Sequence, residues 1–235
     1  MIWTDLDTSR VITSWPAMQL ELTSVAPMTR GDVHRRMALR VAESRRDVAA
    51  VNRVWTERHY LRRRPVPPRV KVLHIMGSLH GVDTGDAGCA CAVTVALLSG
   101  TASRVHRSLC AALAIHPCNV LELVRSWRTD ALTPDIAPDL MPFAIRRIVK
   151  GGNGVKALAV EWNERQLNGG LTAPARVLLT YADGAVGHDG GLYRGAGAVP
   201  VGSTVNGKLA FAWALDSALA DGLKAWASAL KETNE

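Results

Sequence analysis

An acid, an imidazole and a phenol occur close together in one glycine-rich segment, residues 181–193, which reads YADGAVGHDGGLY. Asp183, His188 and Tyr193 are separated there by several glycines, which permit close backbone approach and unusual dihedral angles. Such side chains can bind a metal ion or move protons. The segment follows the apolar run RVLLTY, a predicted strand, and open α/β sheets bind ligands beyond the carboxyl ends of their strands. An ordinary hairpin-like loop is the alternative interpretation.

Two further groups of polar side chains could contribute to the same chemistry. His59 and Tyr60 lie together, although a lone histidine is more often structural. Glu122 and Arg125 lie in an apolar run that ends at Trp127, and alternation along a strand places Glu122 on one face and the other two residues on the opposite face. Charges in such a strand need partners, so a structural ion pair is the alternative to an active-site role.

Helical periodicity precedes His59 and strand patterns follow it. Residues 32–58 predict a helix with one apolar stripe and one arginine face, capped by Thr29 or Asp32, and the following RRRPVPP cannot stay helical. A short helix within 101–118, a helix over Phe143–Lys150, a short helix after the glycine-rich segment and a C-terminal helix capped by Asp216 are also predicted. The predicted strands are Val70–Met76, Gly88–Leu98, Val120–Trp127, Arg176–Tyr181 and Leu209–Leu215.

This order of elements predicts an α/β fold, a mixed central sheet with helices on both faces. Residues 1–28 are predicted to be an N-terminal extension, residues 29–235 one catalytic domain, and residues 153–174 an insertion within it. We expect a cytoplasmic protein, because the chain has no apolar run that could cross a bilayer and its first residues do not resemble a signal peptide. Cys89 and Cys91 share one face of a predicted strand and are interpreted as buried, reduced thiols, with a metal or disulfide role as the alternative.

The net charge of +7 is concentrated in one stretch. Residues 30–71 contain 13 lysine and arginine residues and 4 acids, a net +9, and the remainder of the chain carries −2. Nearly all of these cations are arginines, whose planar guanidinium suits phosphate. The pattern predicts binding to nucleic acid, with a solvated basic helix or a membrane-surface patch as alternatives.

The segments WTERHYL (55–61), LELVRSW (121–127) and LLTYADGAVGHDGGLY (178–193) together resemble the Mom family of phage DNA-modification proteins. The resemblance implies a GNAT-like fold and conversion of adenine N6 in duplex DNA to a carbamoylmethyl adduct, which protects phage DNA from restriction. By motif match, Asp183 and Tyr193 would be active-site residues, His59 and Tyr60 would line the same site, and Arg125 would contact substrate or order the site.

The expected partners follow from this resemblance and from the charge. Double-stranded DNA would be gripped through its phosphates by the basic stretch, with the target adenine flipped out of the helix. Trp55, Tyr60 or Trp127 could stack on that base, although a core position is the alternative for each. The arginines expected to bind DNA are Arg58, Arg62, Arg63, Arg64 and Arg69.

Two features of the sequence bear on the donor and the cofactor. The stretch RTDALTPDIAPDLMP lacks the glycine-containing pyrophosphate loop of GNAT enzymes, which counts against acetyl-CoA. A metal triad of His59, His188 and Asp183 would suit non-haem Fe(II), and the family resemblance also points to iron. A GNAT-type CoA-dependent N-acyltransferase acting on a small amine or a protein, and a non-catalytic DNA-binding phage protein, are the alternative functions.

Overall fold

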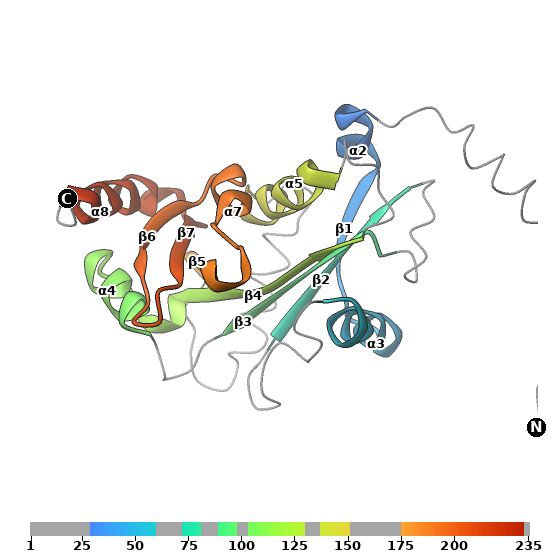
Figure 1. Ribbon diagram of the computed structural model, residues 1–235, viewed down its shortest axis with the longest axis horizontal. Coiled ribbons are helices and arrows are strands. Elements are labelled where there is room, and N and C mark those ends of the chain that lie inside the picture. Colours follow the sequence, from blue (N-terminus) through green and yellow to red (C-terminus); the bar gives the residue numbers. More distant parts are fainter. Residues whose placement is uncertain are drawn as a thin grey trace, which may run out of the picture.

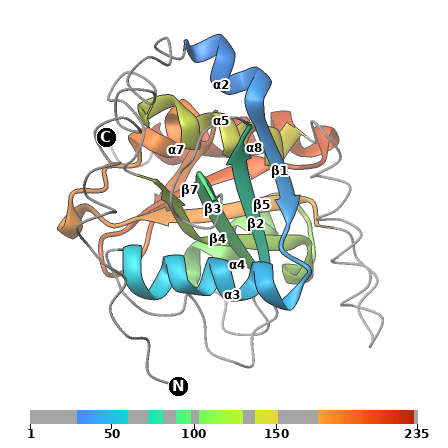
Figure 2. The same cartoon turned by 90° about the vertical axis from the view of Figure 1, so that its right-hand side faces the viewer.

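The computed structural model describes residues 29–59, 72–80, 89–97, 103–129, 137–150 and 175–232. This part of the chain forms a seven-stranded mixed sheet, ordered β1-β2-β3-β4-β5-β7-β6, with helices on both faces (Figures 1 and 2). The predicted α/β class with a mixed central sheet is therefore confirmed. The proposed extension at 1–28 and insertion at 153–174 lie outside the described residues.

Adjacent strands in the sheet are antiparallel, with β4 and β5 as the parallel pair. All five predicted strands are present, and β1 and β6 were not predicted. The strands are β1 Met37–Val41, β2 Val72–Leu79, β3 Cys91–Leu97, β4 Val120–Arg128, β5 Val177–Ala182, β6 Val199–Ser203 and β7 Leu209–Ala214.

Short polar side chains begin several of the helices by accepting a hydrogen bond from the backbone. Thr29 and Asp32, predicted as alternative caps, act together as a capping box. Ser44, Ser103 and Asp216 cap later elements. The helical elements are α2 Arg30–Arg36, α3 Arg45–Arg53, η1 Val54–Arg58, α4 Arg104–Ala112, η2 Pro117–Asn119, α5 Ala137–Lys150, η4 Gly184–Val186, α7 Gly191–Gly195, η5 Ser217–Leu219 and α8 Ala220–Glu232.

The structure corrects two predicted helices. The helix expected over residues 32–58 is divided by β1, where Met37 and Leu39 are buried at the period of two that a strand requires. Helix α5 begins at residue 137, six residues before the predicted start at 143, and includes Pro142. A proline inside a helix costs about 3 kcal/mol, and we attribute its tolerance here to the apolar face that α5 buries against the sheet.

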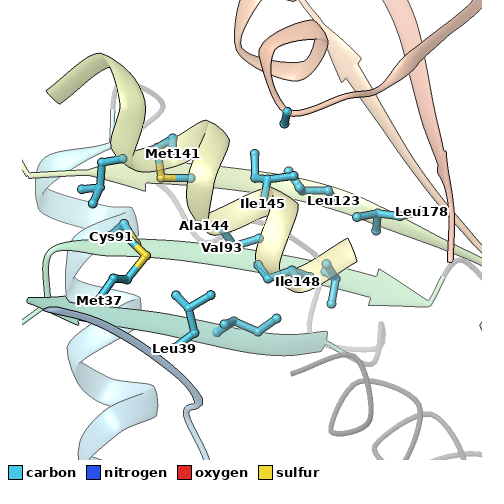
Figure 3. Packing of buried hydrophobic residues seen from close by; sticks show 14 of the residues in the cluster. Met37, Leu39, Cys91, Val93, Leu123, Met141, Ala144, Ile145, Ile148 and Leu178 are labelled. Carbon is cyan, nitrogen blue, oxygen red and sulfur yellow. The ribbon is translucent and has the colours of Figure 1, made fainter. Parts of the chain in front are cut away.

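Two layers of apolar packing cover the sheet. On one face, α2 and α5 pack over β1–β5 with Leu140, Ala144 and Ile145 fully buried (Figure 3). On the other face, α3 and η1 pack over β2 and β3 through Val51 and Trp55, while α4 and α8 pack over β5 and β7. Cys89 and Cys91 are buried, as predicted, and neither forms a disulfide within the described residues.

Candidate functional site

Strands β4 and β5 pair only along their first halves. The parallel register runs from Val120 opposite Val177 to Leu123 opposite Thr180. Strand β4 continues to Arg128, so its second half extends past β5. The sheet therefore opens between these two strands, at the carboxyl end of β5.

A β-bulge in β4 lies at this opening and changes which side chains share a face. Thr94 of β3 pairs with Arg125 and Val95 pairs with Leu123, so Val124 is an extra residue in β4. Glu122 and Arg125 thus lie opposite Ala96 and Thr94, two positions apart on β3, and point to the same face together with Trp127. The prediction that Glu122 lies on the opposite face was wrong because strict alternation ignores the inserted residue.

A cavity of about 840 Å³ occupies the opening between the strands. Its lining includes residues of all three segments that carry the family resemblance, although these segments lie far apart in the sequence. It also reaches both faces of the sheet, because it includes Tyr181, which packs with the α4 layer, and Tyr193, which packs with the α5 layer. Of the predicted site residues, Arg58, His59, Arg125, Asp183, His188 and Tyr193 line this cavity.

Asp183 follows β5 directly and organises the loop that carries His188. Its side chain accepts a hydrogen bond from the Ala185 amide at 3.2 Å, and its carbonyl accepts one from the His188 amide at 3.1 Å. The Nζ of Lys208 lies 2.9 Å from Asp183 Oδ2. The hydrogen bond from Lys208 lowers the pKa of Asp183, so this carboxylate is ionised and paired at neutral pH.

Tyr193, another residue of the cavity lining, is held in place by aromatic packing. Its ring centroid lies 5.7 Å from that of Phe211 and 5.9 Å from that of Trp213. Gly190, with a φ of +81°, begins the short helix α7 directly against Phe211, and a Cβ there would overlap the Phe211 ring. Glycine is therefore required at this position for Tyr193 to reach the cavity.

His59 is buried at the end of η1, 5% exposed, with its ring edge-on to Trp55 at 5.4 Å. Burial, together with the positive charge of Arg125 and the proximity of His188, lowers the pKa of His59 to about 4. The imidazole is therefore neutral at physiological pH. A neutral imidazole can accept or donate a hydrogen bond, but with this pKa it is a weak base.

The residues do not fit the predicted metal centre. Within the residues that the structure describes, no three histidine, cysteine, aspartate or glutamate side chains are grouped so that they could hold a metal ion. His59, His188 and Asp183 share the cavity without forming such a group, and Asp183 is instead paired with Lys208. The prediction of an Fe(II) triad is not supported, and we derive no step through a metal.

Glu122, Tyr181 and Ser103 form a further polar group in the cavity. The hydroxyls of Ser103 and Tyr181 lie 2.6 Å apart. Burial raises the pKa of Glu122 to about 7, with Lys208 acting in the opposite direction. Burial also raises the pKa of Tyr181 to about 12, an effect opposed by the Ser103 hydrogen bond.

Sequence reasoning missed the residues that enter from α4 and from the β6–β7 turn. Ser103, Arg104 and Lys208 line the cavity, and the β6–β7 hairpin lies beside α4 (Figure 1). Strand β6 was not predicted, so nothing in the sequence indicated that a turn would bring Lys208 to Asp183. Tyr60, Arg62, Arg63, Arg64 and Arg69, predicted to bind substrate or DNA, lie outside the described residues.

Comparison with known proteins gives a loose structural likeness. No protein-family model and no curated protein matches the chain. Two structures of the aminoglycoside acetyltransferase AAC(6')-Ib, one with acetyl-CoA and paromomycin and one with coenzyme A, overlap with TM-scores of 0.43 and 0.44 at 13% identity. They cover 76% and 78% of this chain and 93% and 96% of their own. An overlap this loose transfers neither ligand nor substrate.

No described helix is both long enough and apolar enough to cross a membrane.

Proposed function

We propose that the protein is a Mom-type transferase that modifies the N6 amine of adenine in duplex DNA. The observation that carries this proposal is the convergence of the three family-like segments on one cavity, between strands that pair only in part. Of the side chains that the resemblance assigns to the site, Asp183, Tyr193, His59 and Arg125 line that cavity. The fifth, Tyr60, lies outside the described residues.

The charge of the cavity suits a nucleic-acid substrate. Its lining includes the cations Arg58, Arg104, Arg125, Arg128 and Lys208, against the acids Glu122, Asp183 and Asp189. Cations around the entrance would hold phosphates and direct one nucleotide inward. The cavity volume of about 840 Å³ is enough for a flipped base together with a small donor.

The reaction needs an activated donor and a proton acceptor. The lone pair of the adenine amine is delocalised into the ring, so the amine is a poor nucleophile. In the proposed transfer, N6 forms a bond to the carbon of a carbamoylmethyl donor, the bond from that carbon to its leaving group breaks with the electron pair, and N6 loses a proton. Asp183 with Lys208, His59 and Tyr193 would orient the two reactants.

A CoA-dependent N-acyltransferase is the second candidate, and one observation favours it. Within the residues that the structure describes, no strand pairs beyond Leu123 with the β4 edge that faces β5, and residues 123–128 line the cavity. An unpaired strand edge can bind an extended chain containing amides, such as the pantetheine arm of CoA. The segment 130–136, where a pyrophosphate loop would lie, is outside the described residues.

Mass spectrometry of digested plasmid DNA tests the proposal directly. Plasmid from cells that express the protein is expected to contain a carbamoylmethyl deoxyadenosine. Asp183→Ala is expected to abolish it, because the Lys208 pair and the loop that carries His188 both depend on this carboxylate. Asp221→Ala is the matched control, since Asp221 is 99% exposed on α8.

Unmodified adenine from cells containing soluble wild-type protein would contradict the DNA-modification proposal. Tight binding of acetyl-CoA by a protein without DNA affinity would instead support the acyltransferase candidate. Modification that persists in Asp183→Ala would place the reaction elsewhere in the molecule.

A further inference from the structure

Glu122 is a carboxylic acid in the lining of the cavity. It lies on β4 opposite Leu179 of β5, one residue before the end of the parallel pairing. On its other side it lies opposite Ala96 of β3. Its side chain is partly buried and lines the cavity. A carboxyl group in such a position needs a partner or a function, because burying its charge is costly.

Charged and titratable groups face Glu122 from each neighbouring element. Tyr181 approaches from β5, with Ser103 behind it at the start of α4, and Lys208 approaches from the β6–β7 turn. Arg125 shares its face of β4, and Arg104 and Asp183 line the same cavity. Lys208 is paired with Asp183 at 2.9 Å, so its charge is already balanced there. Glu122 therefore lies near Lys208, whose ammonium group forms its ion pair with Asp183 and not with Glu122.

We propose that Glu122 is the proton acceptor of the reaction, a role that rests on the proposed function. As the N6 lone pair forms the new bond to carbon, the electron pair of one N–H bond returns to nitrogen and the proton moves to a Glu122 carboxylate oxygen. The leaving group departs from the donor with its electron pair. Atoms and charge balance without an oxidant, a reductant or a metal.

Other groups in the cavity are less suited to this step. Asp183 is held in its ionised form by Lys208, with a pKa below its ordinary value. His59 has a pKa of about 4 and Tyr181 one of about 12, both far from neutrality. A general base works best when its pKa is close to the working pH, and burial brings the pKa of Glu122 to about 7.

The test measures the modification rate against pH for the wild type, Glu122→Gln and Glu122→Asp. Purified full-length protein is mixed with plasmid DNA and an ultrafiltrate of the expressing host as the donor source, and modified deoxyadenosine is quantified by mass spectrometry. The wild-type rate is expected to rise with pH up to about 7 and then level off. Glu122→Gln is expected to be slower by roughly 10²–10⁴-fold and to lose the inflection in its pH profile. Glu122→Asp is expected to retain part of the rate and to keep an inflection.

Duplex-DNA affinity and far-ultraviolet circular dichroism separate this role from a structural one, because both are expected to stay unchanged in Glu122→Gln. Glu232→Gln, at the exposed end of α8, is the matched control. A Glu122→Gln variant with the wild-type rate or the wild-type inflection would overturn the inference while leaving the proposed function in place. A wild type that makes no modified deoxyadenosine would overturn the proposed function, and this role with it.

Discussion

Gly190 is the residue on which the position of Tyr193 depends most directly. Two separate constraints act on it: a left-handed backbone and contact with the Phe211 ring. Gly197 has a similar φ of +86°, but a Cβ there would meet no atom of the described residues within 4 Å. The two glycines therefore allow backbone strain and steric overlap to be measured separately.

We predict that Gly197→Ala lowers the free energy of unfolding by about 1–2 kcal/mol, the cost of the left-handed region for a residue with a Cβ. Gly190→Ala is expected to lower it by roughly 1–3 kcal/mol more, because Phe211 must move, and to reduce DNA modification by displacing Tyr193. Urea denaturation measures the unfolding free energies of both variants. Mass spectrometry of digested plasmid DNA measures the modification. Equal losses of unfolding free energy in the two variants would show that the Phe211 ring moves aside at no energetic cost.

At the scale of elements, the central strands β2 and β3 join a buried histidine to a buried threonine. His74 Nδ1 lies 2.7 Å from Thr94 Oγ1, and the imidazole is 7% exposed. Burial lowers the pKa of His74 from 6.5 to about 4. The unfolded chain therefore binds a proton below pH 6.5 that the folded chain does not, so the stability is complete above pH 6.5 and is lost as pH falls towards 4.

We predict that His74→Asn flattens the decline in unfolding free energy between pH 6.5 and 4 by up to about 1.4 kcal/mol per pH unit, one proton's contribution. Over the whole interval this amounts to an effect on the order of 3 kcal/mol. Chemical denaturation at several pH values measures the slope. Ser78→Ala, a change on β2 that removes no titratable group, is the control that is expected to keep the wild-type slope. An unchanged slope in His74→Asn would mean that this histidine binds protons equally in the folded and the unfolded chain.

The elements show what the sequence could and could not predict. Strands β3 and β5 were predictable because each is a continuous apolar run, and the glycine-rich segment pointed to the loop around Asp183. Strand β1 was missed because its five residues adjoin two helices whose composition it shares. The bulge at Val124 has no local signature, since its extra residue is visible only through pairing with β3. Lys208 approaches Asp183, and Ser103 approaches Tyr181, only through the tertiary fold. Neither the hydrophobic pattern nor the composition of the sequence predicts these contacts.

At the scale of the whole molecule, part of the positive charge of the chain is engaged in ion pairs with its own acidic residues. Arg35 is paired with Asp32 at 2.7 Å, and Arg40 donates two hydrogen bonds to the Asp47 carboxylate. Other cations, among them Arg58 and Arg104, are exposed and line the cavity. If the protein acts on DNA as proposed, its affinity for DNA is expected to depend more on the residues around the cavity than on the total charge.

We predict that the Kd for duplex DNA rises steeply with salt and that replacing Arg58 and Arg104 together by glutamine lowers the log–log slope by about two, roughly 0.9 for each lost phosphate contact. Lys224→Gln, at a 70% exposed position on α8, is expected to leave the slope unchanged. Fluorescence anisotropy with a labelled duplex at several salt concentrations measures both. Equal slopes in all three proteins would show that DNA binds on another surface.

The extra residue in β4 also bears on how this site can change during evolution. Because side chains alternate along a strand, the face on which Arg125 and Trp127 lie is set by the number of residues before them as much as by their identity. Loss of the Val124 codon would turn both side chains away from Glu122 without altering either amino acid. Relatives of this protein can therefore gain or lose this half of the site through a single in-frame insertion or deletion, which a comparison restricted to substitutions would not register.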